Sequence, residues 1–136
     1  MQSKLQRVID ANLNRSREAL RVCEDIARFV LDDKALTLSI KNIRHATGKI
    51  ITKADLCVCQ GRDVKADLGK KSSFDRSKPG DFKALFYNNI HRAEESMRAL
   101  EEFSKLCAED ISKDFKVLRF KIYVLEKKAL KKLLTL

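Results

Sequence analysis

Apolar residues recur every three or four positions along most of this chain, and charged residues fill the positions between them. Such a period is typical of amphipathic helices, whose apolar stripe packs on a core. The pattern is interrupted at three places, so it predicts four helices. Their expected bounds are about residues 4–31, 34–52, 81–107, and 110 or 112 to the C-terminus.

Residues that favour helix N-termini stand at these interruptions. Asp32 and Asp33 break the first helix and can cap the second, and Asp81 follows a Pro-Gly pair as the expected cap of the third. Asp110 or Ser112 is the expected start of the fourth. Each half of the chain therefore folds back on itself as a helical hairpin.

The two halves repeat one another. Residues 12–28 align with residues 89–105 at a constant offset of 77, without a gap. Five pairs are identical: Asn12/Asn89, Arg15/Arg92, Glu18/Glu95, Arg21/Arg98 and Glu24/Glu101. The expected fold is all-α: two tandem αα-hairpins, related by duplication, that form one four-helix bundle-like domain. The repeats span about 4–52 and 81–134, and a linker covers 53–80.

Composition agrees with this fold. The chain has 136 residues, enough for one domain, and only 4 Gly and 1 Pro, too few turn residues for an all-β protein. Within the linker, Leu56–Cys59 can form a short strand or a buried extended piece. No apolar run is long enough to span a membrane, and the N-terminus lacks an apolar signal segment, so we expect a cytoplasmic protein.

The cysteines favour a structural role. Cys23 and Cys107 fall in apolar helical stripes, where a free thiol packs as a small hydrophobe. Cys57 and Cys59 form a C-x-C pair without the usual zinc spacing or a second pair nearby. Zinc binding is therefore the minor alternative.

The charge points to an anionic partner. The chain carries 29 Lys+Arg against 19 Asp+Glu, a formal net charge of +10. Such a balance attracts nucleic acid, a membrane surface or a phosphorylated small molecule.

Four polar residues interrupt the apolar stripes at equivalent places in the two repeats. They are Asn12, Arg15, Asn89 and Arg92. A buried amide or guanidinium is costly unless it is paired, so this arrangement predicts a polar cleft between the hairpins. Two alternatives remain open: the asparagines can fix helix register, and each arginine can pair with Glu18 or Glu95 three residues on.

The remaining polar positions of the repeats face away from this stripe on a helical wheel. For Arg21, Glu24, Arg98 and Glu101 we expect solvated ion pairs. For His45 and His91 we expect surface or packing roles.

The linker contains a second candidate site. Asp63 and Asp67 lie four residues apart, flanked by Arg62, Lys70 and Lys71. Carboxylates next to basic side chains can hold Mg²⁺ beside a phosphate, although solvated loops often have this composition. The sequence lacks a P-loop or dinucleotide-binding glycine motif, so any phosphate must be bound by side chains and helix N-termini.

Three segments, in order, carry a family resemblance. They are Ile9–Phe29, the linker motif R-D-x-x-x-D-x-G over 62–69, and Asn89–Glu102 followed by Leu118–Arg119. Together they resemble the monofunctional hydroxymethylpyrimidine-phosphate kinases of thiamin biosynthesis, small helical domains found alone or fused ahead of thiamin-phosphate synthase. Because the sequence ends at Leu136, we expect the standalone form.

The resemblance implies a phosphotransferase that uses ATP and Mg²⁺ to convert 4-amino-5-hydroxymethyl-2-methylpyrimidine phosphate to its diphosphate. The expected catalytic residues are Arg15, Arg92 and Asp63. Residues expected to bind substrate or phosphate are Asn12, Asn89, Arg62, Glu18, Glu95, Arg44 and Arg119. The expected Mg²⁺ ligands are Asp63 and Asp67.

Other function classes stay open beside this one. An arginine-lined helical enzyme can act on a small dianion without ATP, as chorismate mutases do. A nucleic-acid-binding module can use Lys127, Lys128, Lys131 and Lys132, but the basic linker offers few aromatic side chains for base stacking. A helical interaction protein needs no cleft. A monomer and a homodimer are both compatible with two hairpins.

Overall fold

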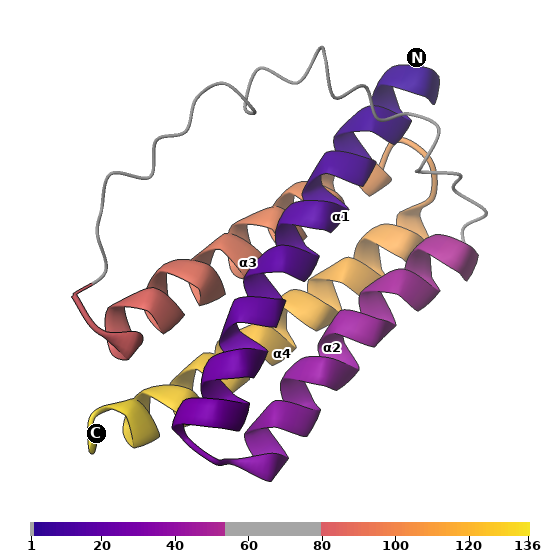
Figure 1. Cartoon of the computed structure of the whole chain (residues 1–136). Coiled ribbons are helices and arrows are strands. Elements are labelled where there is room, and N and C mark those ends of the chain that lie inside the picture. The colour runs from indigo at the N-terminus through magenta and orange to yellow at the C-terminus, as the bar shows by residue number, and fades with distance from the viewer. Residues whose placement is uncertain (1, 54–79) are drawn as a thin grey trace.

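Four helices make up the described parts of the chain. The computed structural model describes residues 2–53 and 80–136. Its helices are α1 (Gln2–Asp25), α2 (Lys34–Lys53), α3 (Phe82–Ser104) and α4 (Glu109–Leu133), as Figure 1 shows. The expected all-α bundle of two hairpins is confirmed. The candidate strand at 56–59, with Cys57 and Cys59, lies outside the described residues.

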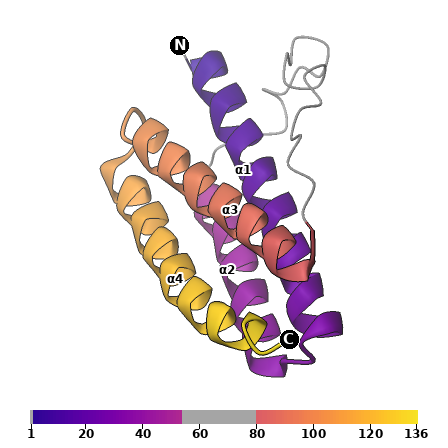
Figure 2. The same ribbon diagram turned by 90° about the vertical axis from the view of Figure 1, so that its left-hand side faces the viewer.

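The helices pack as a ring in which each contacts two neighbours. The packing is most extensive between α1 and α3 and between α3 and α4, and it is smaller between α2 and α4 and between α1 and α2. Figures 1 and 2 both show α3 and α4 side by side. The core between the four helices is apolar, and its largest fully buried side chains include Phe86, Phe115, Leu20 and Met97. No helix in the described ranges is long and apolar enough to cross a membrane.

Two of the expected helix caps are present. The Asp33 carboxylate accepts a hydrogen bond from the Leu36 backbone N–H at 3.0 Å, at the start of α2. The Asp81 carboxylate accepts from the Ala84 N–H at 2.8 Å, at the start of α3. Each cap satisfies an N–H that has no partner within its helix, which explains why both helices begin where the sequence indicates.

The start of α4 was predicted wrongly. The helix begins at Glu109, and the residue before it, Ala108, has no side chain that can cap. Ser112 is buried, and its hydroxyl donates to the Glu101 carbonyl at 2.7 Å. This serine therefore ties α4 to α3 instead of starting a helix.

The end of the first helix differs from a plain α-helix. α1 ends at Asp25, and a five-residue π-helix, Ile26–Val30, follows it. The π-helix closes with a hydrogen bond from the Leu31 N–H to the Ile26 carbonyl at 3.0 Å. Asp32 then adopts a left-handed backbone with φ of 49°. The wider π turn and the left-handed Asp32 together reverse the chain into α2. The apolar period alone had predicted one continuous helix to residue 31.

The two described cysteines have different surroundings. Cys23 is fully buried, and burial raises the pKa of its thiol, with the Glu94 charge adding to the effect. Cys107 is exposed, which contradicts its expected place in the core. The reason is that α3 ends at Ser104, so Cys107 falls in the turn before α4. Phe103 lies near this end and is also largely exposed.

Candidate functional site

A polar cleft lies between α1 and α3, where the two repeats meet. Its volume is about 590 Å³, which is within the range of small-molecule sites. Both repeats contribute equivalent residues to it. The lining comprises Asn12, Arg15, Glu18, Ala19 and Val22 from α1 and Asn89, Arg92, Glu95 and Ser96 from α3. The six polar candidates that the repeat singled out on these two helices are therefore brought together.

The two asparagines have the same environment. Asn12 is 7% exposed and Asn89 is 6% exposed. Each amide N–H donates to the carbonyl four residues earlier, Asn12 to Val8 and Asn89 to Leu85, both at 2.9 Å. These bonds lie within each helix, so they do not supply the interhelical register contact that was the alternative. The asparagines instead present buried polar groups at the floor of the cleft.

The charged residues form the mouth of the cleft. Arg15 and Glu18 are exposed on α1, as are Arg92 and Glu95 on α3. The Arg15 guanidinium donates to the Asn12 side-chain oxygen at 3.4 Å, which links mouth and floor. Guanidinium groups bind phosphate oxygens through paired hydrogen bonds, and carboxylates bind divalent cations. The mouth can thus receive a phosphate together with its counter-ion.

A second pair of repeated residues is buried, contrary to expectation. Glu24 is 2% exposed and binds Arg44 of α2 at 3.2 Å, while Glu101 binds Arg119 of α4 at 3.0 Å. The helical wheel placed both glutamates towards solvent because it ignores the second helix of each hairpin. Both ion pairs connect the two helices of a hairpin, at equivalent places. They stabilise each hairpin as a unit.

Arg44 and Arg119 therefore do not line the central cleft. Arg119 also donates to the Tyr123 hydroxyl at 3.1 Å, and this bond, with the Glu101 charge, raises the pKa of Arg119 against the effect of burial. Neither arginine is therefore placed beside Arg15, and their predicted role in binding substrate or phosphate stays a prediction.

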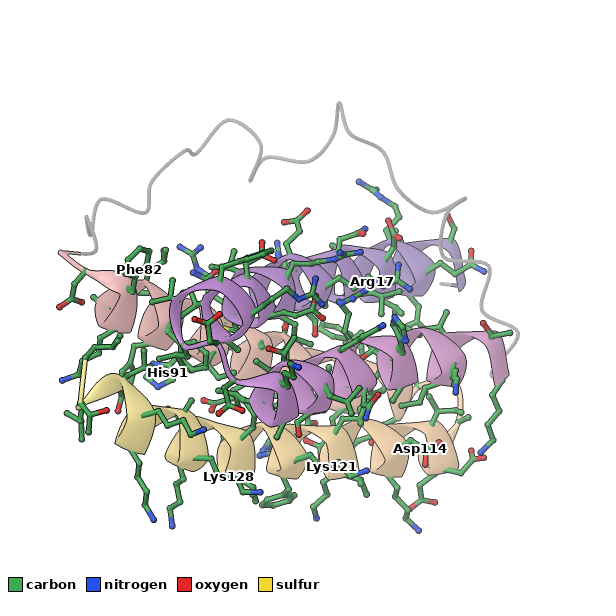
Figure 3. The ribbon with its side chains drawn as sticks, turned by 60° about the horizontal axis from the view of Figure 1, so that its bottom comes forward. Arg17, Phe82, His91, Asp114, Lys121 and Lys128 are labelled. Carbon is green, nitrogen blue, oxygen red and sulfur yellow. The ribbon has the colours of Figure 1, made fainter. Side chains whose placement is uncertain are left out.

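A metal-binding geometry that the sequence reasoning missed lies between α3 and α4. The ligand atoms of His91, Glu94 and Glu126 all lie within 4.8 Å of one another, and His91 Nε2 is 2.8 Å from Glu126 Oε1. Figure 3 shows His91 between these helices. The available signal was the H-x-x-E spacing on one helical face. Burial, then a hydrogen bond shared with Glu126 and the charges of Glu126 and Glu95, raises the pKa of Glu94 to about 8.

The expected magnesium residues Asp63 and Asp67, and their neighbour Arg62, lie outside the described residues. Their roles stay predictions.

A larger, mostly apolar hollow of about 930 Å³ lies between α2 and α4. Apolar side chains such as Leu36, Ile43 and Leu118 line it, with lysines at its border. Lys121 and Lys128 project from α4 (Figure 3). The hollow contains none of the residues predicted for the kinase site, but Lys128, Lys131 and Lys132 of the nucleic-acid-binding alternative line it.

These features define a class of protein: a duplicated helical bundle whose repeats contribute equivalent asparagine, arginine and glutamate side chains to one cleft. Comparison with known families identifies the class further. The model of the ThiD2 family matches residues 7–128, so the chain belongs to the ThiD2 family.

Three curated relatives are similar to most of this chain, and all are named thiamine-phosphate synthase. The protein of Thermosynechococcus vestitus is 34% identical over 123 residues, which cover 90% of this chain and 34% of that protein. That of Nostoc punctiforme is 35% identical over 127 residues, 93% of this chain and 35% of the relative. That of a Synechocystis species is 36% identical over 123 residues, with 90% and 35% covered.

The chain thus spans about one third of the length of the curated relatives it matches. The names of these relatives connect the family with thiamin biosynthesis, which agrees with the pathway that the sequence resemblance implied. The names describe a synthase and not a kinase. No solved structure matches this chain.

Proposed function

We propose that this protein acts in thiamin biosynthesis as a phosphotransferase that converts 4-amino-5-hydroxymethyl-2-methylpyrimidine phosphate to its diphosphate, with ATP as phosphoryl donor. The observation that carries the proposal is the cleft between α1 and α3, which pairs two arginines with two asparagines and two glutamates. Membership of the ThiD2 family and the names of the relatives support the pathway.

The cleft suits the charge balance of this reaction. Acceptor and donor are both anionic, so the protein must neutralise negative charge and hold the reacting groups in line. Arg15 and Arg92 would bind phosphate oxygens as bidentate forks, one from each repeat. Asn12 and Asn89 would orient a phosphate or the pyrimidine edge.

The donor set of the cleft fits Mg²⁺. Glu18 and Glu95 offer hard carboxylate oxygens at the mouth, and Asp63 and Asp67 of the linker would add two more. When bound, Mg²⁺ supplies charge neutralisation on the transferring phosphoryl group. Of these carboxylates, Glu18 and Glu95 line the same cleft as Arg15 and Arg92.

The transfer requires no strong general base. An oxygen of the acceptor phosphate is already ionised and forms the new bond to the γ-phosphorus of ATP. The bond between that phosphorus and the bridging oxygen breaks, and ADP leaves with the electron pair. Arg15 and Arg92 would stabilise the charge that spreads over the equatorial oxygens.

The direct test is an assay of the purified chain with the pyrimidine monophosphate and ATP-Mg²⁺. We expect ADP and pyrimidine diphosphate in equimolar amounts. The unphosphorylated pyrimidine, used as the control acceptor, should not react at the rate of the monophosphate. Absence of ATP-dependent product would refute the proposal. Turnover of a small dianion without ATP would favour the chorismate-mutase-like alternative.

A further inference from the structure

A second, strongly basic cleft lies on the α1–α2 side of the bundle. Its volume is about 850 Å³. The lining consists of Arg17, Arg21, Arg44, His45, Gly48, Lys49, Thr52 and Lys53, none of which lines the central cleft. Figure 3 labels Arg17 on α1, well separated from His91. Five of the eight lining residues carry a permanent positive charge, so the cleft is built for an anion.

The positive charge in this cleft is poorly compensated. Glu24 pairs with Arg44, and Lys53 lies 3.6 Å from the half-exposed Asp114. Within the described ranges 2–53 and 80–136, no carboxylate lies at ion-pair distance from Arg17, Arg21 or Lys49. Clustered like charges repel each other, and a bound polyanion would relieve that repulsion.

The duplication shows that this cleft is not a consequence of the fold alone. The second helices of the hairpins align at an offset of 75, which matches Arg44 with Arg119 and Lys53 with Lys128. In this alignment Gly48 corresponds to Tyr123.

In the second hairpin two aromatic side chains flank the equivalent arginine. The Arg119 guanidinium donates to the Tyr123 hydroxyl, and its carbon lies 5.1 Å from the centre of the Phe120 ring and 5.7 Å from that of Tyr123. In the first hairpin His45 and Gly48 replace these two aromatic residues. The Arg119 and Arg44 side chains are buried to a similar extent, 10% and 13% exposed, so the repeats differ in the residues beside the arginine and not in its burial.

Gly48 has a specific packing reason. A glycine inside a helix is destabilising relative to alanine by about 0.5–1 kcal/mol, so its presence in α2 calls for an explanation. A Cβ at this position would lie 3.2 Å from Nη2 of Arg17. The missing side chain lets the Arg17 guanidinium lie against α2, in the cleft that Arg44 and Lys49 also line.

We propose that this basic cleft is a second anion-binding site, distinct from the central cleft, and that it takes the diphosphate or triphosphate chain of a small molecule. Arg44 and Lys53 already have carboxylate partners, which leaves the charges of Arg17, Arg21 and Lys49. A single phosphate would compensate only part of this charge, whereas a diphosphate or triphosphate chain matches it more closely. Arginine forks favour phosphate, and apart from His45 the lining has no aromatic ring on which a base could stack. The inference does not depend on the proposed function.

The test maps binding by residue. ¹⁵N-labelled Arg15→Gln protein, in which the central cleft is weakened, is titrated with inorganic diphosphate and, separately, with ADP. We expect saturable shifts of the Gly48, Lys49 and Thr52 backbone amides. Equal shifts with both ligands would mean that the cleft recognises the phosphate chain itself. Larger shifts with ADP would mean that it recognises a diphosphate carried by an organic group.

Three variants in that background decide the site. Gly48→Tyr introduces the tyrosine of the second repeat, Arg17→Gln removes a guanidinium, and Lys116→Gln removes an equal charge from an exposed position that lines neither cleft nor the apolar hollow. The first two should weaken the affinity by about tenfold or more, and Lys116→Gln should leave it unchanged.

Several outcomes would overturn the proposal. They are the absence of saturable shifts at these amides, affinity unaffected by Gly48→Tyr and Arg17→Gln, or shifts spread equally over the lysines of α4. Tighter binding of a short RNA at the same amides would reassign the cleft to nucleic acid. Retained amide dispersion in each variant would show that the fold is intact. The kinase assay is a separate measurement, so either proposal can fail alone.

Discussion

Asn12 and Asn89 show how a single residue type can be anticipated from sequence while its role needs the structure. The repeat and the apolar stripe predicted that both side chains are buried, and both are. Whether they fix helix register or line a cleft depends on where their amides point. That direction is set by the packing of α1 on α3, which a single helical wheel does not contain.

Replacing either cleft asparagine should reduce activity more than stability. Asn12→Ala and Asn89→Ala each remove the hydrogen bond that the amide donates within its helix, which contributes about 1 kcal/mol to the free energy of unfolding. Asn12→Ala also removes the hydrogen bond that Asn12 accepts from Arg15. If the amides orient substrate, kcat/KM should fall by about tenfold or more. Phosphoryl transfer assays and thermal unfolding measure the two effects.

Asn14→Ala is the matched control. Asn14 donates to the Asp10 carbonyl at 3.0 Å, with the same four-residue spacing, but it lies outside the cleft. Equal activity of all three variants would contradict the binding role of Asn12 and Asn89.

Glu94 should make stability depend on pH. Its pKa is raised to about 8 in the folded protein, above its ordinary value of 4.5, and the groups that face it are His91, Glu95 and Glu126. The folded state therefore holds a proton that the unfolded state has lost between those two pH values. The stabilisation is complete below about pH 4.5 and is lost as the pH rises through about 8.

Urea unfolding of the wild type and of Glu94→Gln at a series of pH values tests this. The difference in unfolding free energy between them should shift in favour of Glu94→Gln as the pH rises. Glu109→Gln, at an exposed position that does not contribute to the Glu94 shift, serves as control. A difference that stays constant from about pH 5 to 8 would show that Glu94 ionises normally.

At the level of helices, the sequence predicted correctly those features that depend only on residues close together in the chain. Asp33 and Asp81 cap the helices that they were expected to cap, because capping needs only one side chain and the next turn. The sequence reasoning was wrong for features that depend on a neighbouring helix. The burial of Glu24 and Glu101 depends on an arginine 20 and 18 residues away, and no helical period reports it. The π-helix after α1 likewise left no mark in the apolar period.

The interhelical ion pairs should be important for stability. Glu101→Gln leaves the guanidinium of Arg119 in a buried place without its counter-charge, so we expect a loss of about 3 kcal/mol. The exposed neighbour provides the control: Glu102→Gln should change the stability little, because an exposed ion pair is screened by solvent.

The double variant Glu101→Gln/Arg119→Gln should lose less than the two single variants together, since neither charge is then left alone. Chemical denaturation of the four proteins gives the coupling energy. Additive losses would mean that the two side chains do not stabilise one another.

For the whole molecule, duplication is the feature that could be read most securely from the sequence. An uninterrupted offset of 77 predicted two equivalent hairpins, and the structure has them. It also predicted that equivalent polar residues meet, as they do in the central cleft. The sequence could not indicate that the first hairpin opens a separate basic cleft. That cleft depends on Gly48, which stands where the second repeat has Tyr123, lying next to the Arg17 guanidinium.

The central claim is that the cleft formed by both repeats performs phosphoryl transfer. The most direct measurement is kcat/KM for ATP-dependent phosphorylation of the pyrimidine monophosphate by Arg15→Gln and Arg92→Gln, with Arg7→Gln on an exposed position of α1 as control. We expect each cleft variant to lose about 100-fold, and the control to match the wild type. Wild-type activity in either cleft variant would contradict the claim.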